Sequence, residues 1–195
     1  MPIPKPLEQY LKKNNIRYDV VAHKIVFTAY DLAATLREKM ERIGKTLLVK
    51  TDSGYVLVVL SANRRLDFGK LKAALGAKKV SLVNEKEMVK ALKVKAGALT
   101  AFGALHKAAV FVDSALAKAS DALVSSGSFT DSIRVKMKDF LKLENAKTGN
   151  ISIAADLPKL QKPRKVQKHN KGSKRKSGKK TSTRSKTTKK TKTRK

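Results

Sequence analysis

Residues 43–76 read IGKTLLVKTDSGYVLVVLSANRRLDFGKLKAALG, and this stretch decides the fold class of the chain. The run at 55–60 is apolar without interruption and has the length of a strand, which is typical of a strand buried on both faces. An Asp-Ser-Gly turn at 52–54 sends the chain back beside residues 46–49. The pattern therefore predicts two neighbouring strands, the second of which is central to a sheet.

A helix should follow this pair of strands. Asp67 is a candidate N-cap, apolar residues then recur at helical spacing, and Gly76 can adopt the left-handed conformation that ends a helix. Lys45, between a glycine and a threonine, suggests a phosphate-binding loop. The ATP-binding pattern needs a glycine at position 39 and a helix after the lysine, whereas this chain has Lys39 and the strand-like LLVK. We reject ATP binding; from composition alone, Lys45 is a solvated lysine at a strand end.

The other elements alternate irregularly along residues 1–158, with pairs of strands as well as single crossovers. This order predicts an α/β mixed (α+β) fold, in which a mixed sheet or partly closed barrel is flanked by helices. The further helices are expected from Leu7 to about Asn14, at 28–40 behind a Thr28–Asp31 capping box, at 85–92 behind Asn84, and at 138–143; the further strands are expected at 18–22, 80–83, 108–113, 122–125 and 132–135.

The charge divides the chain into two parts. Residues 159–195 hold 18 of the 45 basic residues and none of the 15 acidic ones, so this part carries +18 of the formal net charge of +30. After Leu160 its one sizeable apolar residue is Val166, so it cannot bury enough surface to offset the entropy of ordering. We expect a domain at 1–158, basic but large enough for a core, and a disordered basic tail at 159–195.

The absence of cysteine excludes a thiol nucleophile, disulfides and thiolate metal sites. No run is apolar and long enough for a signal peptide or a membrane span, so we expect a cytoplasmic protein without membrane attachment. His106 and His169 lie far apart without a supporting carboxylate pattern, so no metal is expected. We expect no cofactor either.

The second distinctive stretch is GALTAFG at 97–103. Small residues at this density let backbone amides approach a ligand closely. An ordinary connection between a helix and a strand would explain the same residues. Taken alone, the stretch leaves both interpretations open.

Together these features resemble the YbaK-type aminoacyl-tRNA deacylases, relatives of the editing domain of bacterial prolyl-tRNA synthetase. The resemblance covers roughly residues 7–153, and it rests on the order and spacing of many segments. They are His23 before an alanine-rich helix, GKTL at 44–47, VLVVLSANRRLD at 56–67, LGAKKVSLVNEKEM at 75–88, GALTAFG at 97–103, VFVD at 110–113, SSGS at 125–128 and DFLKL at 139–143.

The resemblance implies a YbaK-like domain that hydrolyses the ester between a wrong amino acid and tRNA. Lys45 would hold the terminal adenosine or its phosphate, and the loop would surround the scissile carbonyl. An aminoacyl ester is already activated, so oriented water and oxyanion donors can suffice. The catalytic residues implied are Lys45, Gly97, Thr100 and Ala101; the substrate-binding residues are His23, Ala98, Leu99, Phe102, Gly103, Ser126, Gly127 and Ser128.

Two positions depart from the family. Ala101 stands where proline is usual, which would loosen the loop because alanine does not fix φ. Phe129 stands where some members have histidine, so a polar contact there would be missing. His23 has a structural explanation as well as a functional one, Asp113 is better explained as a cap of the segment that follows its strand, and the serines at 126 and 128 are equally explained by turn chemistry.

The tail resembles the Lys/Ser/Thr-rich tails of linker-histone-like proteins in composition. Such a polycation binds RNA or DNA through counterion release with little sequence information. We expect it to capture tRNA; ribosomal RNA or nucleoid DNA are alternative partners, and a non-catalytic nucleic-acid-binding protein is the alternative to the enzyme. The tail residues expected to bind nucleic acid are Lys162, Arg164, Lys165, Lys168, Lys171, Lys174, Arg175, Lys176, Lys179 and Lys180.

Overall fold

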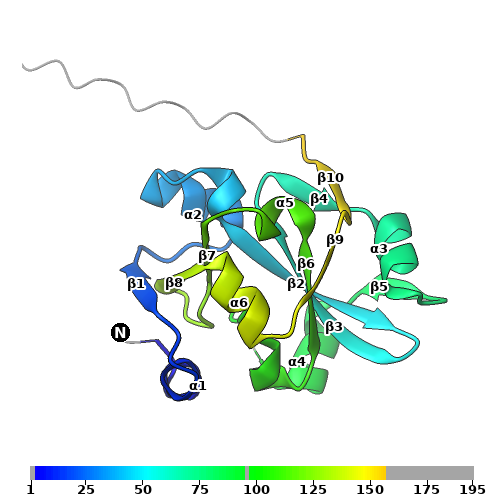
Figure 1. The fold of residues 1–195 in the computed structure, drawn as a ribbon, viewed down its shortest axis with the longest axis horizontal. Helices are drawn as coiled ribbons and strands as arrows, with labels where there is room; N and C mark the ends of the chain where they lie inside the picture. The colour runs from blue at the N-terminus through cyan, green and yellow to red at the C-terminus, as the bar shows by residue number, and fades with distance from the viewer. Residues whose placement is uncertain (1–2, 95–96, 157–195) are drawn as a thin grey trace, which may run out of the picture. The chain divides into compact units, whose positions relative to one another are not determined.

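The computed structural model describes residues 3–94 and 97–156 and is built around a five-stranded mixed sheet (Figure 1). The predicted tail and its ten candidate binding residues lie outside the described residues. The central strand β3 (Gly54–Ser61) pairs antiparallel with β2 (Gly44–Thr51) on one side and parallel with β6 (Ala109–Asp113) on the other, which confirms the central position predicted for 55–60. The strands follow the order β5 (Val80–Leu82), β2 (Gly44–Thr51), β3 (Gly54–Ser61), β6 (Ala109–Asp113), β9 (Lys147–Gly149).

Two smaller sheets complete the strands. One has the antiparallel order β1 (Tyr18–Ala22), β8 (Asp131–Lys136), β7 (Asp121–Ser125); in the other, β4 (Arg64–Leu66) pairs with β10 (Ser152–Ala154). β7 touches the beginning of β2 through one parallel bridge, between Ile43 and Leu123. The expectation of a mixed α/β fold is confirmed, and the sheets do not close into a barrel.

The helices begin and end largely at the predicted residues. Asp67 accepts a hydrogen bond from the Lys70 amide, Asn84 accepts one from the Glu87 amide, and Gly76 ends its helix at φ 63°. In the described part of the chain no helix has the length and apolar character needed to cross a bilayer. The helices are α1 (Lys5–Lys13), α2 (Ala29–Leu36), α3 (Phe68–Leu75), α4 (Glu85–Leu92), α5 (Ser114–Ala117) and α6 (Met137–Leu143), with 3-10 turns η1 (Met40–Arg42) and η2 (Gly103–His106).

The end of α2 differs most from the prediction. The capping box is present, since the Asp31 amide donates to the Thr28 hydroxyl at 3.0 Å. However, α2 ends at Leu36 because Arg37 adopts the left-handed conformation, at φ 55°. The predicted continuation to Met40 is therefore wrong, and Met40 begins the separate turn η1.

The core lies on both faces of β3. Leu57 and Val59 belong to one cluster and Val58 and Leu60 to the other, as expected for a strand whose side chains alternate. All four side chains are fully buried. Helices α1, α4, α5 and α6 contribute to the first cluster, while α3 contributes Leu71 to the second. The prediction that this strand is buried on both faces is confirmed.

A single buried carboxylate connects several of these elements. Asp113, which is 1% exposed, caps α5 through the Ala115 amide at 3.1 Å, as predicted. Its other oxygen accepts hydrogen bonds from the Ile151 amide at 3.2 Å and the Ser152 hydroxyl at 2.8 Å. Arg64 Nε also donates to the Ser152 hydroxyl oxygen, at 2.9 Å. Asp113 thus joins β6 to the β4–β10 pair.

We expect Asp113→Ala to lower the free energy of unfolding by about 3 kcal/mol, because it leaves two buried donors, the Ile151 amide and the Ser152 hydroxyl, and the partly buried Ala115 amide without their charged acceptor. Asp67→Ala is the matched control, since it removes only an exposed helix cap and should cost about 1 kcal/mol. Urea denaturation of both variants at neutral pH measures the difference. Equal losses for the two variants would contradict the role of Asp113 as a junction.

Candidate functional site

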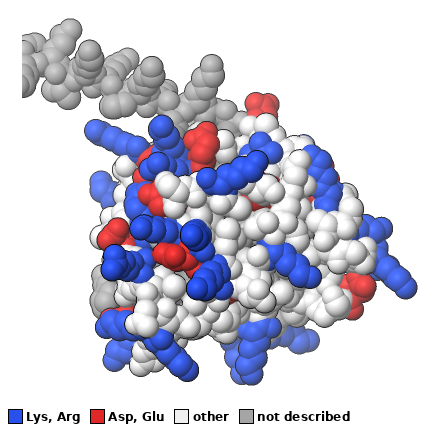
Figure 2. Space-filling model, viewed as in Figure 1, with Lys and Arg blue, Asp and Glu red and all other residues white. Residues whose placement is uncertain are grey.

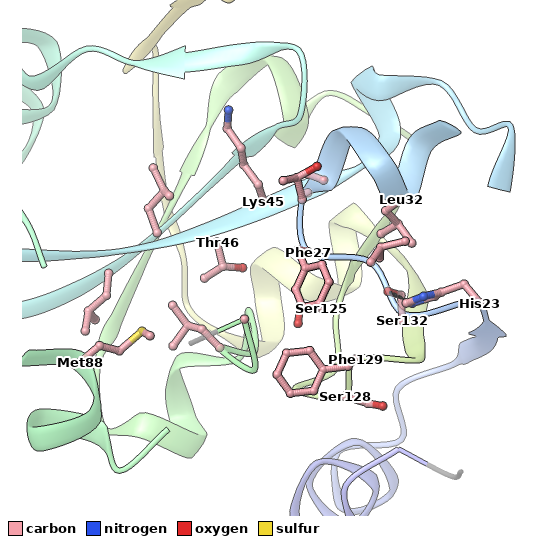
Figure 3. A pocket seen from close by; sticks show the side chains of 18 of the residues that line it. His23, Phe27, Leu32, Lys45, Thr46, Met88, Ser125, Ser128, Phe129 and Ser132 are labelled. Carbon is pink, nitrogen blue, oxygen red and sulfur yellow. Dashed lines mark hydrogen bonds between the residues drawn. The ribbon is translucent and has the colours of Figure 1, made fainter. Parts of the chain in front are cut away.

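A pocket of about 280 Å³ opens where the sheets separate at the beginning of β2. On this side of β2, β5 pairs only with residues 49–51, and the bridge to β7 involves only Ile43. Residues 44–47 have no strand partner on this side in the described part of the chain, and the pocket occupies that gap. Its walls come from β2, the segment 23–32, α4, the loop after α4 and the turn between β7 and β8 (Figure 3).

Several predicted site residues, distant in sequence, meet at this pocket. Those that line it are His23, Lys45, Gly97, Leu99 and Ser128. Phe129, noted as a departure from the family, lines it as well. The other predicted residues are absent from the lining: Ala98, Thr100, Ala101, Phe102, Gly103, Ser126 and Gly127.

The second half of the predicted loop supports the first half. Thr100, Ala101 and Phe102 are buried. The Thr100 hydroxyl and the Ala101 amide both donate to the Ser125 carbonyl, at 3.1 and 3.3 Å. A proline at 101 has no N–H and could not donate this second bond. The alanine therefore gains a hydrogen bond that opposes the expected loosening of the loop. These residues hold the loop against the end of β7.

Lys45 lies at the rim of the pocket. Its side chain runs away from Phe129 and Met88 (Figure 3), and its ammonium donates a hydrogen bond to the Arg64 carbonyl of β4. Burial lowers the pKa of this lysine. Because an ammonium has three donors, two remain for a ligand after the bond to Arg64. Lys45 therefore presents a positive charge where the pocket opens toward β4.

Thr46 contributes a polar group that the sequence analysis did not select. Side chains alternate along β2, so Thr46 lies on the opposite face of the strand from Lys45 (Figure 3). It lines the pocket, and its buried hydroxyl has no hydrogen-bond partner among the described residues. Buried polar groups are usually paired, so this hydroxyl is available to a ligand. Its position next to Lys45 on a predicted strand was the signal that could have identified it.

His23 is held by both ring nitrogens. Nδ1 lies 2.8 Å from the Lys24 carbonyl, which can only accept, so Nδ1 carries the proton. In the neutral ring, Nε2 then accepts a hydrogen bond from the Ser132 hydroxyl at 3.0 Å. Ser132 was not predicted, and it also lines the pocket. These bonds orient the imidazole at the pocket wall.

The turn between β7 and β8 is organised by Asp131. The hydroxyls of Ser128 and Thr130 donate to its carboxylate at 3.0 and 2.7 Å, and the Ser126 hydroxyl donates to its backbone carbonyl at 2.6 Å. The hydrogen bond from Thr130, aided by that from Ser128, lowers the pKa of Asp131 against the opposing effect of burial. Both predicted serines therefore take part in turn chemistry, and only Ser128 also lines the pocket.

Gly97 and Phe129 connect this turn to the loop. Gly97 adopts φ 80°, and a Cβ added there would lie 2.8 Å from Cε1 of Phe129. Both the backbone conformation and the contact with the ring therefore require glycine. Phe129 stands at the position where the resemblance implies a histidine in some family members. In this chain it forms an apolar part of the pocket wall.

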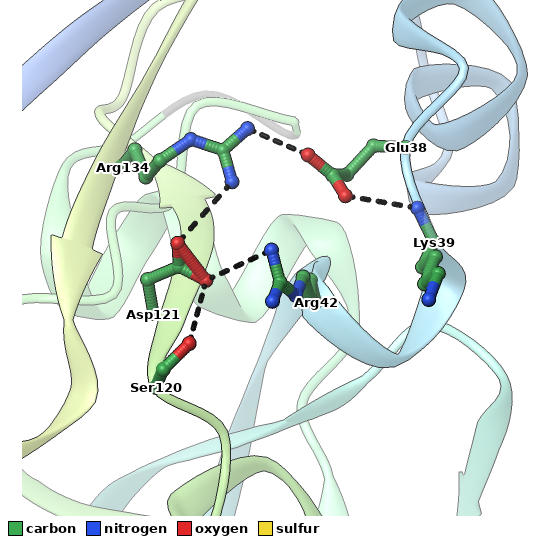
Figure 4. Close-up of polar contacts among 6 residues, drawn as sticks. All are labelled: Glu38, Lys39, Arg42, Ser120, Asp121 and Arg134. Atoms are coloured by element: carbon green, nitrogen blue, oxygen red, sulfur yellow. Dashed lines mark hydrogen bonds and ion pairs between the residues drawn. The ribbon is translucent and has the colours of Figure 1, made fainter.

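Four charged side chains fasten the segment after α2 to the sheet beside the pocket (Figure 4). Arg134 pairs with Glu38 at 2.6 Å and with Asp121 at 3.7 Å, while Arg42 pairs with Asp121 at 3.4 Å. Burial raises the pKa of Glu38, but its bonds to Arg134 and the Lys39 amide, with the charges of Arg134 and Arg42, lower it overall. Because α2 contributes Leu32 to the pocket, this cluster helps to hold one wall in place.

The described residues contain no group of three or more His, Cys, Asp or Glu side chains that could hold a metal ion. His106 lies in η2, away from the pocket lining, and burial lowers its pKa. His169 lies outside the described residues.

Comparison with known proteins gives a consistent result. The family model of the aminoacyl-tRNA editing domain matches residues 23–143, which is more than half of the chain. The prolyl-tRNA editing protein ProX of Acetoanaerobium sticklandii is 29% identical over 98 residues, 49% of this chain and 60% of that protein. The prolyl-tRNA synthetase associated domain-containing protein 1 of Danio rerio is 31% identical over 97 residues, 49% of this chain and 53% of that protein. The matches thus span little more than half the length of these relatives.

Solved structures share the fold. The crystal structure of the hypothetical protein APE2540 superposes with a TM-score of 0.70 at 20% identity, covering 76% of this chain and all of that one. A protein proposed to be a trans-editing enzyme for prolyl tRNA synthetase gives a TM-score of 0.66 at 18% identity, covering 78% of this chain and all of that one. At these identities the likeness concerns the fold alone.

We expect Glu38→Gln to lower the free energy of unfolding by about 1 kcal/mol at pH 7, because it breaks a partly buried ion pair. The folded-state pKa of Glu38 lies below its usual 4.5, so its contribution is present above that pH and is lost as the pH falls through the lowered pKa. Urea denaturation of wild type and variant at pH 7 and pH 3 should show the difference shrinking. Glu8→Gln, in the exposed Lys12–Glu8 pair, is the control and should change stability little; a difference for Glu38→Gln independent of pH would contradict the assignment.

Proposed function

This chain belongs to the family of aminoacyl-tRNA editing domains, and we propose that it is a deacylase that hydrolyses mischarged aminoacyl-tRNA. The observation that carries the proposal is the pocket, which brings Lys45, the loop at 97–99 and the turn at Ser128 around one small volume. The substrate is the ester between an amino acid and the terminal ribose of tRNA. The products are the free amino acid and intact tRNA.

The size and lining of the pocket support a small uncharged amino acid as the group removed. A volume of about 280 Å³ is at the lower end for ligand sites. Most of its lining is apolar, including Leu32, Leu99 and Phe129, and no Asp or Glu is among its described lining residues. A cationic side chain would lose its hydration there without gaining an acidic partner, and the one lysine of the described lining, Lys45, is proposed to hold the acceptor end of the tRNA. The unpaired Thr46 hydroxyl provides one hydrogen-bonding position for the aminoacyl group.

The chemistry proposed needs no protein nucleophile. Water adds to the ester carbonyl and gives up a proton, the resulting tetrahedral oxyanion collapses, and the acyl–oxygen bond breaks as the ribose oxygen leaves and takes up a proton to become a hydroxyl. Backbone N–H groups of the loop at 97–99 would stabilise the oxyanion, since preorganised donors act most strongly where charge develops. Lys45 would hold the acceptor end of the tRNA with its two remaining N–H donors.

Partner and location follow from the substrate. The basic tail at 159–195 would raise the local concentration of tRNA through counterion release, as an additional binding site raises avidity. The protein would act in the cytoplasm, where tRNA is charged. The non-catalytic alternative is not favoured, because Ala101 is hydrogen-bonded and Phe129 is packed in the site, so neither departure disrupts it.

We expect Lys45→Ala to lower kcat/KM for the susceptible mischarged tRNA by about 100-fold or more, because the acceptor end loses its charged anchor. Lys50→Ala is the matched control: Lys50 lies on the same strand but is exposed and paired with Glu87, so its loss should change kcat/KM little. The measurement is release of amino acid from tRNAs mischarged with small uncharged amino acids. A chain ending at Pro158 should show a higher KM with kcat preserved.

If no mischarged tRNA in the panel is hydrolysed, the enzyme proposal is wrong. Tight RNA or DNA binding that depends on the tail, in the absence of hydrolysis, would then support the non-catalytic alternative. Equal losses of kcat/KM in Lys45→Ala and Lys50→Ala would contradict a specific role of Lys45 in holding the acceptor end.

We expect Gly97→Ala to lower kcat/KM by about tenfold, which corresponds to about 1.4 kcal/mol, because the new methyl group meets the Phe129 ring at a strained φ. The double variant Gly97→Ala/Phe129→Ala should recover part of the loss, since it removes the clash and leaves the backbone strain. Kinetics on one mischarged tRNA compare the two variants with Phe129→Ala alone. If the loss in the double variant, expressed as free energy, equals the sum of the losses of Gly97→Ala and Phe129→Ala, the contact between residue 97 and the Phe129 ring is contradicted.

A further inference from the structure

A second groove, of about 570 Å³, lies directly beside the pocket. Three residues line both cavities: Lys45, Leu47 and Leu82. The groove continues from these over β4, the beginning of α3 and β10. A ligand that fills the pocket and is longer than the pocket can therefore enter the groove by passing Lys45.

The wall of this groove is apolar and exposed. Phe68, the first residue of α3, is 44% exposed, and Leu82 of β5 is 53% exposed. Both are among the few large hydrophobic side chains that the described residues leave so open to solvent. An exposed aromatic ring beside a binding pocket is a platform on which a nucleic-acid base can stack.

Positive charge borders the same wall. Arg65 is exposed on β4, and the described residues give its side chain no acidic partner. Asp67 also lines the groove, but its carboxylate accepts the Lys70 amide at 3.0 Å and so caps the positive end of α3. More generally, the face of the molecule drawn in Figure 2 carries more lysine and arginine than acidic side chains. A phosphate would thus find cations beside the apolar wall.

We propose that this groove binds the single-stranded nucleotides that precede the terminal adenosine of the tRNA, with a base on Phe68 and a phosphate at Arg65. The inference rests on the proposed function: with the terminal ester in the pocket and the acceptor end held by Lys45, the preceding nucleotides lie beside the groove that shares Lys45 with the pocket. The combination of a stacking surface and unpaired cations fits a single-stranded nucleic acid. An apolar peptide would use Phe68 and Leu82 but would leave Arg65 without a role.

A binding experiment with the full chain tests the groove without depending on hydrolysis. The probe is a single-stranded oligoribonucleotide that ends in the acceptor sequence and carries no amino acid. It has 2-aminopurine in place of the base before the terminal adenosine. Stacking on Phe68 should change its fluorescence, and binding to the tail should leave that base unstacked. We expect Phe68→Ala to remove the fluorescence change and to weaken this binding roughly tenfold. Arg65→Ala should reduce the dependence of log Kd on log salt by about 0.7, the value for one phosphate of a single strand.

Matched controls are available elsewhere on the surface. Val89→Ala removes a similarly exposed apolar side chain from α4, and Arg17→Ala removes an exposed arginine; neither residue lines the pocket or the groove. Both controls should bind the probe as the wild type does. The proposal is overturned if Phe68→Ala binds like the wild type, or if Val89→Ala weakens binding as much.

Kinetics separate this inference from the proposed function. Phe68→Ala should lower kcat/KM roughly tenfold for mischarged tRNA but less than about twofold for the corresponding aminoacyl-adenosine, which has no preceding nucleotide. Equal losses on both substrates would make Phe68 a structural residue and overturn the groove. If the wild type hydrolyses neither substrate, the proposed function fails, and the fluorescence experiment still decides whether the groove binds the nucleotides.

Discussion

Burial of β3 on both faces is the constraint on which the other elements depend. Its alternating side chains enter two separate hydrophobic clusters, so helices must cover both sides of the sheet. At about 25 cal/mol per Å² of apolar surface, burying four aliphatic side chains of this strand stabilises the fold by several kcal/mol. β2 and β6 are held against its two edges, and their neighbours position the segments that surround the pocket.

The site exists because β2 is only partly paired on its outer side. β5 takes up the far end of that side and β7 touches only its beginning, so a gap opens at residues 44–47. Strand alternation then places Lys45 and Thr46 on opposite faces at the same gap (Figure 3). One faces the rim and carries charge, while the other offers a buried hydroxyl to the interior. A charged group at the rim and an unpaired hydroxyl in the interior thus come from adjacent residues of one strand.

The pocket walls are held by polar contacts around the cavity. The Ser125 carbonyl accepts two hydrogen bonds from the loop, Asp131 organises the turn, and the ion pairs around Arg134 fasten the segment after α2 (Figure 4). Ser125 and Ser128 line the pocket, but their partners Thr100 and Asp131, like Arg134, do not. The lining can therefore stay largely apolar while its boundary is held in place, as the proposed positioning of a small ester would require.

Local patterns in the sequence determined the central strand, the turn at 52–54 between β2 and β3, the helix caps at Asp67 and Asn84, and the mixed α/β class. These features depend on residues a few positions apart, whose conformational preferences act within one element. The sequence pattern did not reveal β9, β10 or α5, because three or four residues carry no periodicity and form only against a neighbour. Only the tertiary structure decided that Thr46 and Ser132 join Lys45 at one pocket, and that Thr100 and Ala101 stand behind it. Such a meeting depends on how distant segments pack, and no local preference encodes that packing.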